Sequence, residues 1–133
     1  MKKLLILLIS INIVSCSTTR INYDELVKED DNIMYYQGKP FTGIVFDMWN
    51  KKQVKNEANF VNGKLEGKGI GYYESGVVNW KGNYLDGKLK GKVTSYYKSG
   101  NIYLEGNYVS DKLISEKCID EDGVEINCLE DAY

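Results

Sequence analysis

The sequence predicts an all-β protein in which repeated β-hairpins form a single-layer antiparallel meander that ends in a C-terminal hairpin. Two observations predict this fold class. A 24-residue unit recurs through residues 60–107, and it carries glycine-bearing turn signals at two fixed positions. Between those turns apolar and polar residues alternate, which is the pattern of strands with one dry face.

Residues 1–15 have the layout of a lipoprotein signal peptide. A short basic start, Lys2 and Lys3, precedes an apolar run that is too short for a comfortable membrane span of about 20 residues. The run closes on Ile13-Val14-Ser15-Cys16, which resembles the bacterial lipobox. The resemblance implies that Cys16 is acylated and becomes the N-terminus, so the membrane is a partner through a lipid anchor carrying palmitate-type chains. The alternative is an ordinary signal peptide with a coincidental cysteine.

A lipid anchor predicts a protein of the cell envelope. Residues 16–20 would form the tether, and Ser17 after the cysteine favours the outer membrane in a cell that has one. Residues 21–117 would form the repeat domain. The segment of residues 20–31, which spans the start of this domain, carries Ile21, Tyr23, Leu26 and Val27, which we interpret as a strand, with a helical turn as the alternative.

The repeat is clearest where residues 60–83 read FVNGKLEGKGIGYYESGVVNWKGN and residues 84–107 read YLDGKLKGKVTSYYKSGNIYLEGN. Eleven of the 24 aligned positions are identical, which chance does not plausibly produce. A degenerate copy of the unit begins at Gly38, with one extra residue between its two glycines. Another copy begins at Tyr108 and decays after Leu113.

Each unit predicts two turns. Asn62-Gly63 and Asp86-Gly87 are signals for type I′ hairpin turns, because both central residues need positive φ. Glu74-Ser75-Gly76 and Lys98-Ser99-Gly100 predict three-residue loops with glycine at the left-handed position.

The alternation between turns assigns residues to two faces of the sheet. One face would carry Val78, Trp80, Gly82 and Tyr84, and one period later Ile102, Leu104, Gly106 and Tyr108. Polar residues such as Asn79, Lys81 and Asn83 would occupy the other face. Gly82, Gly106 and Ala58 share one position of the unit, where a small residue would leave room for a neighbouring aromatic ring.

These units resemble the MORN-variant repeats of bacterial proteins, whose pattern is roughly NGK-x-x-G-x-x-x-x-YY-x-x-G-x-x-x-x-x-G. The match covers about residues 35–113, and the opening segment YYQGKPFTG is similar to that of the YwqK-type antitoxin family. The resemblance implies a curved meander of hairpins without enzymatic activity. Lys52 and Asp111 stand where the pattern has turn glycines, so we expect those two hairpins to be looser or differently bent.

Residues 118–128 predict a C-terminal hairpin that turns near Asp122-Gly123, followed by a tail over residues 129–133. Folding there would bring Cys118 and Cys128 within a residue or two of each other. In an oxidising compartment we expect a disulfide worth roughly 2–3 kcal/mol, with two free thiols as the alternative. The bond would hold the last strand in place at the end of the sheet, where its free edge could otherwise pair with another chain.

The amino-acid composition excludes several kinds of catalytic site, metal site and partner. Among 133 residues there is no histidine, which excludes Ser-His-Asp and Cys-His nucleophile systems and His-ligated zinc. Loss of residues 1–15 removes two lysines and takes the formal charge from −2 to −4, which argues against nucleic acid as a partner. We therefore expect no catalytic residues, no cofactor, no metal and no small-molecule substrate. Acidic residues such as Asp24, Glu116 and Asp120 are interpreted as a solvated surface.

Three tyrosine pairs form the candidate binding surface: Tyr35 and Tyr36, Tyr72 and Tyr73, and Tyr96 and Tyr97. Neighbours in a strand face opposite ways, so one tyrosine of each pair would pack and the other would be exposed. The exposed set would form an aromatic ladder beside lysines. The competing interpretation is that the rings only stabilise a thin sheet by cross-strand stacking.

The sequence therefore favours a non-catalytic, lipid-anchored envelope protein that presents a β-repeat surface to an unidentified protein partner. Two alternatives stay open. One is an antitoxin or immunity protein that neutralises a toxin at the envelope, as the family resemblance implies. The other is a lipid- or glycan-binding module, although an acidic mature chain disfavours anionic lipid.

Overall fold

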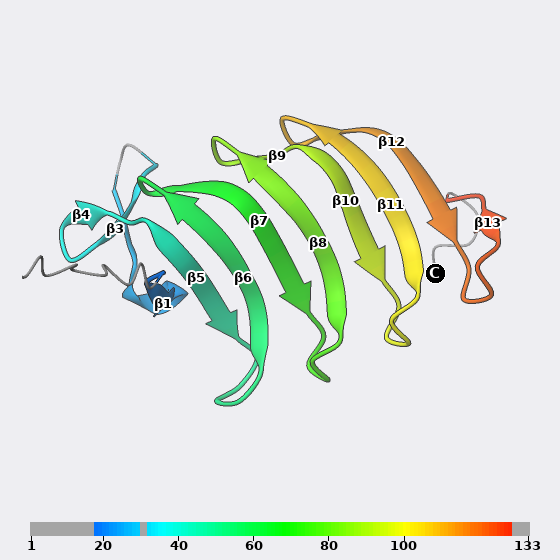
Figure 1. The fold of residues 1–133 in the computed structure, drawn as a ribbon, viewed down its shortest axis with the longest axis horizontal. Helices are drawn as coiled ribbons and strands as arrows, with labels where there is room; N and C mark the ends of the chain where they lie inside the picture. The colour runs from blue at the N-terminus through cyan, green and yellow to red at the C-terminus, as the bar shows by residue number, and fades with distance from the viewer. Residues whose placement is uncertain (1–17, 30–31, 129–133) are drawn as a thin grey trace, which may run out of the picture.

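The computed structural model describes residues 18–29 and 32–128, and nearly every element in this part of the chain is a β-strand (Figure 1). The expected signal peptide, Cys16 and the tail 129–133 lie outside the described residues. The strands are β1 Arg20–Asn22, β2 Val27–Lys28, β3 Met34–Tyr36, β4 Lys39–Pro40, β5 Gly43–Met48, β6 Val54–Val61, β7 Lys64–Tyr72, β8 Val78–Leu85, β9 Lys88–Leu89, β10 Gly91–Tyr96, β11 Ile102–Val109, β12 Lys112–Ile119 and β13 Glu125–Ile126. The described residues contain no helix long and apolar enough to span a membrane.

A ten-stranded sheet carries most of these strands in the order β1-β5-β6-β7-β8-β10-β11-β12-β13, with β9 paired to β8. From β5 onward every neighbour pair is antiparallel, and each pair is consecutive in sequence except β8 and β10, between which the two-residue β9 intervenes; this confirms the expected meander of hairpins. Figure 1 shows the hairpins side by side along the long axis, with β3 and β4 at one end and β13 at the other.

The N-terminal end departs from the expected single layer. β1 pairs with β5 in parallel, so the sheet is not antiparallel throughout, and β2, β3 and β4 form a separate three-stranded sheet. Residues 20–28 contain both of the structures considered from the sequence. A strand comes first, and a 3-10 turn at Tyr23–Glu25 then begins at Asn22, whose side chain accepts from Asp24 N while Glu25 caps Asn22 N.

The hydrophobic core lies at this end, because this is where two layers of the described residues meet. Ile21, Phe41, Val45 and Phe60 are buried together, and the side chains packed around them are Leu26, Met34, Tyr36, Ala58 and Leu65. Pairing of Ile21 with Val45 explains why β1 joins β5, since it buries an isoleucine that the tether would otherwise expose. Farther along, the sheet is one layer thick and buries Val93 and Cys118.

The hairpin turns follow the sequence prediction closely. Asn62 and Gly63 have φ of 49° and 79°, and Asp86 and Gly87 have φ of 50° and 80°, as type I′ turns require. At the last copy the expectation of a looser turn is wrong. Ser110 and Asp111 take φ of 48° and 67°, because aspartate tolerates the left-handed region better than most side chains do.

The loops at the opposite ends of the strands also match. Tyr73 N donates to Val77 O and Tyr97 N donates to Asn101 O, so each pair closes a three-residue loop. The loop at Lys52 is bent differently, as expected. Asn50 Oδ1 accepts from both Lys52 N and Gln53 N, so the asparagine side chain stabilises this turn, which has no glycine at the position of Lys52.

Each of these three type I′ turns is also bound to the part of the chain before it. The amide of the second turn residue donates to a carbonyl 22 residues earlier: Gly63 N to Phe41 O at 2.7 Å, Gly87 N to Leu65 O at 2.9 Å, and Asp111 N to Leu89 O at 3.1 Å. The same contact in three successive units is the nearest-neighbour pattern of a repeat protein.

One expectation about the small residues needs correction. A Cβ on Gly106 would lie 2.9 Å from the Tyr108 ring, as predicted for this position, but a Cβ on Gly82 would meet Val93 Cγ2 at 3.0 Å and not an aromatic ring. The Tyr84 ring crosses instead to the neighbouring strand, where it lies 2.8 Å from the Cβ position of Gly69. Glycine on the adjacent strand therefore makes room for that ring.

Candidate binding groove

The tyrosine pairs divide between the two faces of the sheet, as alternation requires. Tyr72 Oη donates to Glu57 Oε1 at 2.9 Å, and Lys81 Nζ lies 5.2 Å from the centre of the Tyr96 ring, so the first members share a face with charged side chains. Tyr73 and Tyr97 line a groove on the opposite face.

The expected exposure of one tyrosine per pair is not found. All six residues are half-buried. Tyr35 and Tyr36 lie in β3 of the small sheet, where the Tyr36 ring meets Phe41 edge-on at 5.9 Å. Tyr72 and Tyr96 end β7 and β10 of the large sheet, and Tyr73 and Tyr97 directly follow them, so the structure does not bring the six together as one ladder. A thin sheet leaves few fully exposed positions for large rings, since each ring lies over its neighbours.

Tyr73 and Tyr97, the second tyrosines of two of the pairs, belong to a periodic set of hydrogen bonds that we call the rungs. Trp49 Nε1 donates to Tyr72 O at 2.8 Å, Tyr73 Oη to Tyr96 O at 2.6 Å, and Tyr97 Oη to Ile119 O at 3.0 Å. Trp49, Tyr73 and Tyr97 occupy the same position of three successive units, and each bonds the next hairpin. The rungs support the stabilising interpretation for Tyr73 and Tyr97.

The groove itself lies at the C-terminal end of the sheet and has a volume of about 660 Å³. Its walls include Tyr73, Tyr97, Tyr103, Leu104, Glu116 and the two cysteines of the C-terminal hairpin. The Tyr97 and Tyr103 ring centres are 5.4 Å apart and tilted by 52°. Burial raises the pKa of Tyr73 above the usual tyrosine value, and the neighbouring Tyr103 raises it further.

The far wall of the groove is a disulfide between Cys118 and Cys128, whose Cα atoms are 5.2 Å apart. This bond confirms the sequence prediction, as does the hairpin turn, in which Asp120 N donates to Val124 O. β13 pairs with β12 only at Cys118 and Ile119. The disulfide therefore holds a short cap strand on one end of β12.

Tyr103 is the groove residue that the sequence does not single out. It lies one period after Asn79, so the repeat gives no aromatic signal at this position. It is 37% exposed, which makes it the most accessible of the three groove tyrosines, since Tyr73 and Tyr97 fall below the exposed class. Its neighbour in the strand, Leu104, was assigned to the apolar face and does line the groove.

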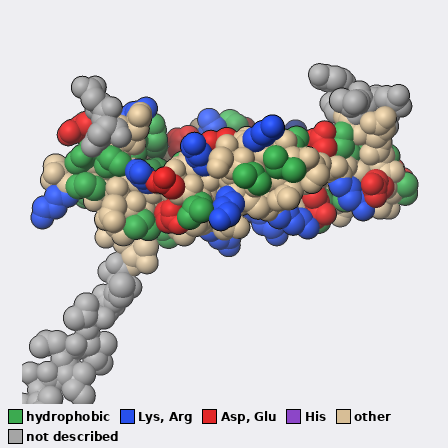
Figure 2. All heavy atoms as spheres, turned by 90° about the horizontal axis from the view of Figure 1, so that it is seen from above, with side chains coloured by type: hydrophobic (Ala, Val, Ile, Leu, Met, Phe, Trp, Pro, Cys, Tyr) green, Lys and Arg blue, Asp and Glu red, His purple; other side chains and the backbone are tan. Residues whose placement is uncertain are grey.

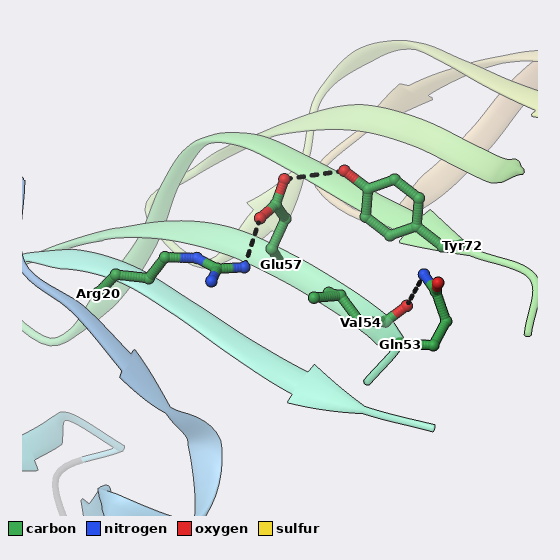
Figure 3. Close-up of polar contacts among 5 residues, drawn as sticks. All are labelled: Arg20, Gln53, Val54, Glu57 and Tyr72. Atoms are coloured by element: carbon green, nitrogen blue, oxygen red, sulfur yellow. Dashed lines mark hydrogen bonds and ion pairs between the residues drawn. The ribbon is translucent and has the colours of Figure 1, made fainter. Parts of the chain in front are cut away.

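The other face of the sheet carries the chain's own charge networks. Glu57 accepts from Tyr72 and pairs with Arg20 at 3.2 Å, which ties β1, β6 and β7 together (Figure 3). Burial, followed by the bond to Glu57, raises the pKa of Tyr72. Figure 3 also shows Gln53 Nε2 donating to Val54 O beside this network. These contacts fix the strands relative to one another.

A shallow depression of about 210 Å³ near the middle of the sheet is lined by Lys68, Lys81 and Lys92 around Asn83. In Figure 2, basic side chains gather along the lower long edge of the molecule, with acidic groups more frequent towards its ends. Within residues 18–29 and 32–128, no group of three or more cysteine or acidic side chains is arranged to hold a metal ion.

No protein-family model, curated protein or solved structure matches this chain. The fold and the groove therefore define it by themselves as an all-β hairpin-repeat protein with an aromatic groove at its C-terminal end.

Proposed function

We propose that this chain is a non-catalytic, lipid-anchored envelope protein of the MORN-variant class that binds a protein partner through the groove lined by Tyr73, Tyr97 and Tyr103. The observation that carries the proposal is the groove: its volume of about 660 Å³ lies in the range of sites that accept ligands or anchoring side chains. Tyrosine is among the residues that contribute most to protein interfaces.

The rungs support this role because they fix two of the three rings. The hydroxyls of Tyr73 and Tyr97 bond backbone carbonyls of the next hairpin, so neither ring has to be ordered when a partner binds. Tyr103 packs against Tyr97 and remains the most accessible of the three. A preorganised aromatic wall is suited to recognition of a side chain or peptide.

Two further features support a place in the envelope. The sequence of residues 1–16 has the layout of a lipoprotein signal, and Cys118 and Cys128 form a disulfide, which persists in oxidising compartments. The Cys16→Ser variant should lose incorporation of radiolabelled palmitate. Unchanged incorporation would show that the anchor is not at this cysteine.

The partner is tested by capture from envelope fractions with the full chain as bait. We expect one stoichiometric protein with the parent chain and its loss with Tyr103→Ala, because Tyr103 makes none of the rung hydrogen bonds and its removal leaves the fold in place. Tyr23→Ala is the matched control, since Tyr23 is 53% exposed at the other end of the chain. Equal capture by parent and Tyr103→Ala would exclude the groove as the binding site.

A further inference from the structure

We infer that the groove accepts the guanidinium group of an arginine side chain supplied by the partner, an inference that rests on the proposed function and names its anchor. The groove combines three tyrosine rings with one carboxylate, Glu116. Aromatic faces and a carboxylate are the two kinds of group that attract an organic cation.

Two of the three groove tyrosines present mainly ring surface to a ligand. Tyr73 Oη and Tyr97 Oη are each committed to a backbone carbonyl, at 2.6 and 3.0 Å. These two hydroxyls have no proton left to donate, so what the two residues offer a ligand is the face and edge of the ring and an oxygen that can only accept. Such surface attracts a flat cation more strongly than it attracts a neutral group of the same shape.

Glu116 gives the groove its charge. It is exposed, it forms no ion pair or hydrogen bond with any other described residue, and no lysine or arginine lines the groove beside it. Its neighbour Lys117 faces the other side of β12 and pairs with Glu125 at 2.8 Å. Asp120, Glu121 and Asp122 in the adjacent hairpin turn add further negative charge.

Other aromatic residues of this sheet already have a cation from the chain itself. The Arg20 guanidinium lies 4.3 Å from the Phe46 ring centre, Lys55 Nζ 4.8 Å from that of Trp49, and Lys81 Nζ 5.2 Å from that of Tyr96. Across the described residues, no lysine or arginine covers a groove tyrosine. The groove is thus the aromatic cluster where a cation from another molecule fits.

Arginine fits this site better than lysine does. Its guanidinium is planar, stacks on tyrosine faces and can place two N–H groups on one carboxylate, whereas the lysine ammonium is compact and strongly hydrated. Arginine is also among the residues most enriched at the energetic centres of interfaces.

The test uses the mature full chain in detergent micelles and two probes, Nα-acetyl-arginine amide and the citrulline analogue. Citrulline has nearly the same shape as arginine without the charge. We expect nuclear magnetic resonance titration of the tyrosine ring signals to show about tenfold tighter binding of the arginine probe. Glu116→Gln should reduce this preference several-fold, while Glu29→Gln, an exposed glutamate outside the groove lining and far along the chain from it, should leave it unchanged.

Equal binding of the two probes, or a preference that survives in Glu116→Gln undiminished, would overturn the arginine assignment. Partner capture separates this outcome from failure of the proposed function. If Tyr103→Ala still loses the partner while the probes bind equally, the groove is an interface without an arginine anchor. If Tyr103→Ala retains the partner, the proposed function itself is wrong.

Discussion

The rung hydrogen bonds make a quantitative prediction for Tyr73→Phe. The variant keeps the ring and removes only the hydroxyl that donates to Tyr96 O at 2.6 Å, a half-buried contact between two hairpins. A neutral hydrogen bond of this kind contributes about 1 kcal/mol, part of it the cost of leaving a carbonyl unpaired. With an unfolding entropy of about 2.1 cal/mol/K per residue over roughly 110 described residues, the melting temperature should fall by about 4 °C.

Thermal unfolding of the full chain followed by circular dichroism measures this change. Tyr97→Phe should show a similar decrease, because its hydroxyl donates to Ile119 O in the next unit. Tyr23→Phe is the control, since that hydroxyl makes no hydrogen bond to another described residue and its loss should leave the melting temperature unchanged. If Tyr73→Phe and Tyr23→Phe have the same melting temperature, the rung hydrogen bonds do not contribute to the stability of the fold.

Three other predictions concern the disulfide, a turn and alkaline pH. Reduction of Cys118–Cys128, which closes a loop with a sequence separation of 10, should lower the free energy of unfolding by about 3 kcal/mol; an unchanged urea midpoint with reductant would contradict this. Gly87→Ala should cost about 1 kcal/mol by denaturant unfolding, because φ is +80° with nothing within 4 Å of the added Cβ. Gly87→Asp should cost less, as Asp111 occupies the matching position at φ 67°, and equal costs would exclude backbone strain as the cause. The free energy of unfolding should fall as pH rises above about 10, because the raised pKa of Tyr73 lets the unfolded chain lose its proton first; stability that increases there would refute the direction of the shift.

The turns and the disulfide were predictable because their signals are local. Asn62-Gly63 and Asp86-Gly87 have few other conformations as favourable as a type I′ turn, and that turn fixes the register of the strands around it. The hairpin over residues 118–128 then needs only its own turn to bring the two cysteines together. The alternating faces followed from the same local rule.

The N-terminal layer was not predictable in the same way. β1 lies parallel to β5 because Ile21 is buried beside Val45, a contact between residues that no turn or repeat links. The small sheet of β2, β3 and β4 packs against the buried cluster that contains Ile21 and Val45. The 24-residue pattern carries no information about this sheet.

The candidate site was predicted in part. Tyr73 and Tyr97 were selected as members of the repeated pairs, and both line the groove. Tyr103 was missed because the equivalent residue of the preceding unit is Asn79. Glu116 was grouped with a solvated acidic surface, since its place beside three rings depends on how β12 packs against the neighbouring hairpins. A repeat pattern predicts the residues that all units have in common, whereas Tyr103 and Glu116 belong to the last units alone.

We propose that the groove is where a partner binds the protein. The most direct measurement replaces Tyr103 with a photo-reactive phenylalanine analogue in the full chain and irradiates living cells. We expect one protein adduct from the envelope at position 103, its decrease when Glu116→Gln is added, and no such adduct from the same probe at position 23. Absence of an adduct at position 103, or the same adducts at both positions, would contradict it.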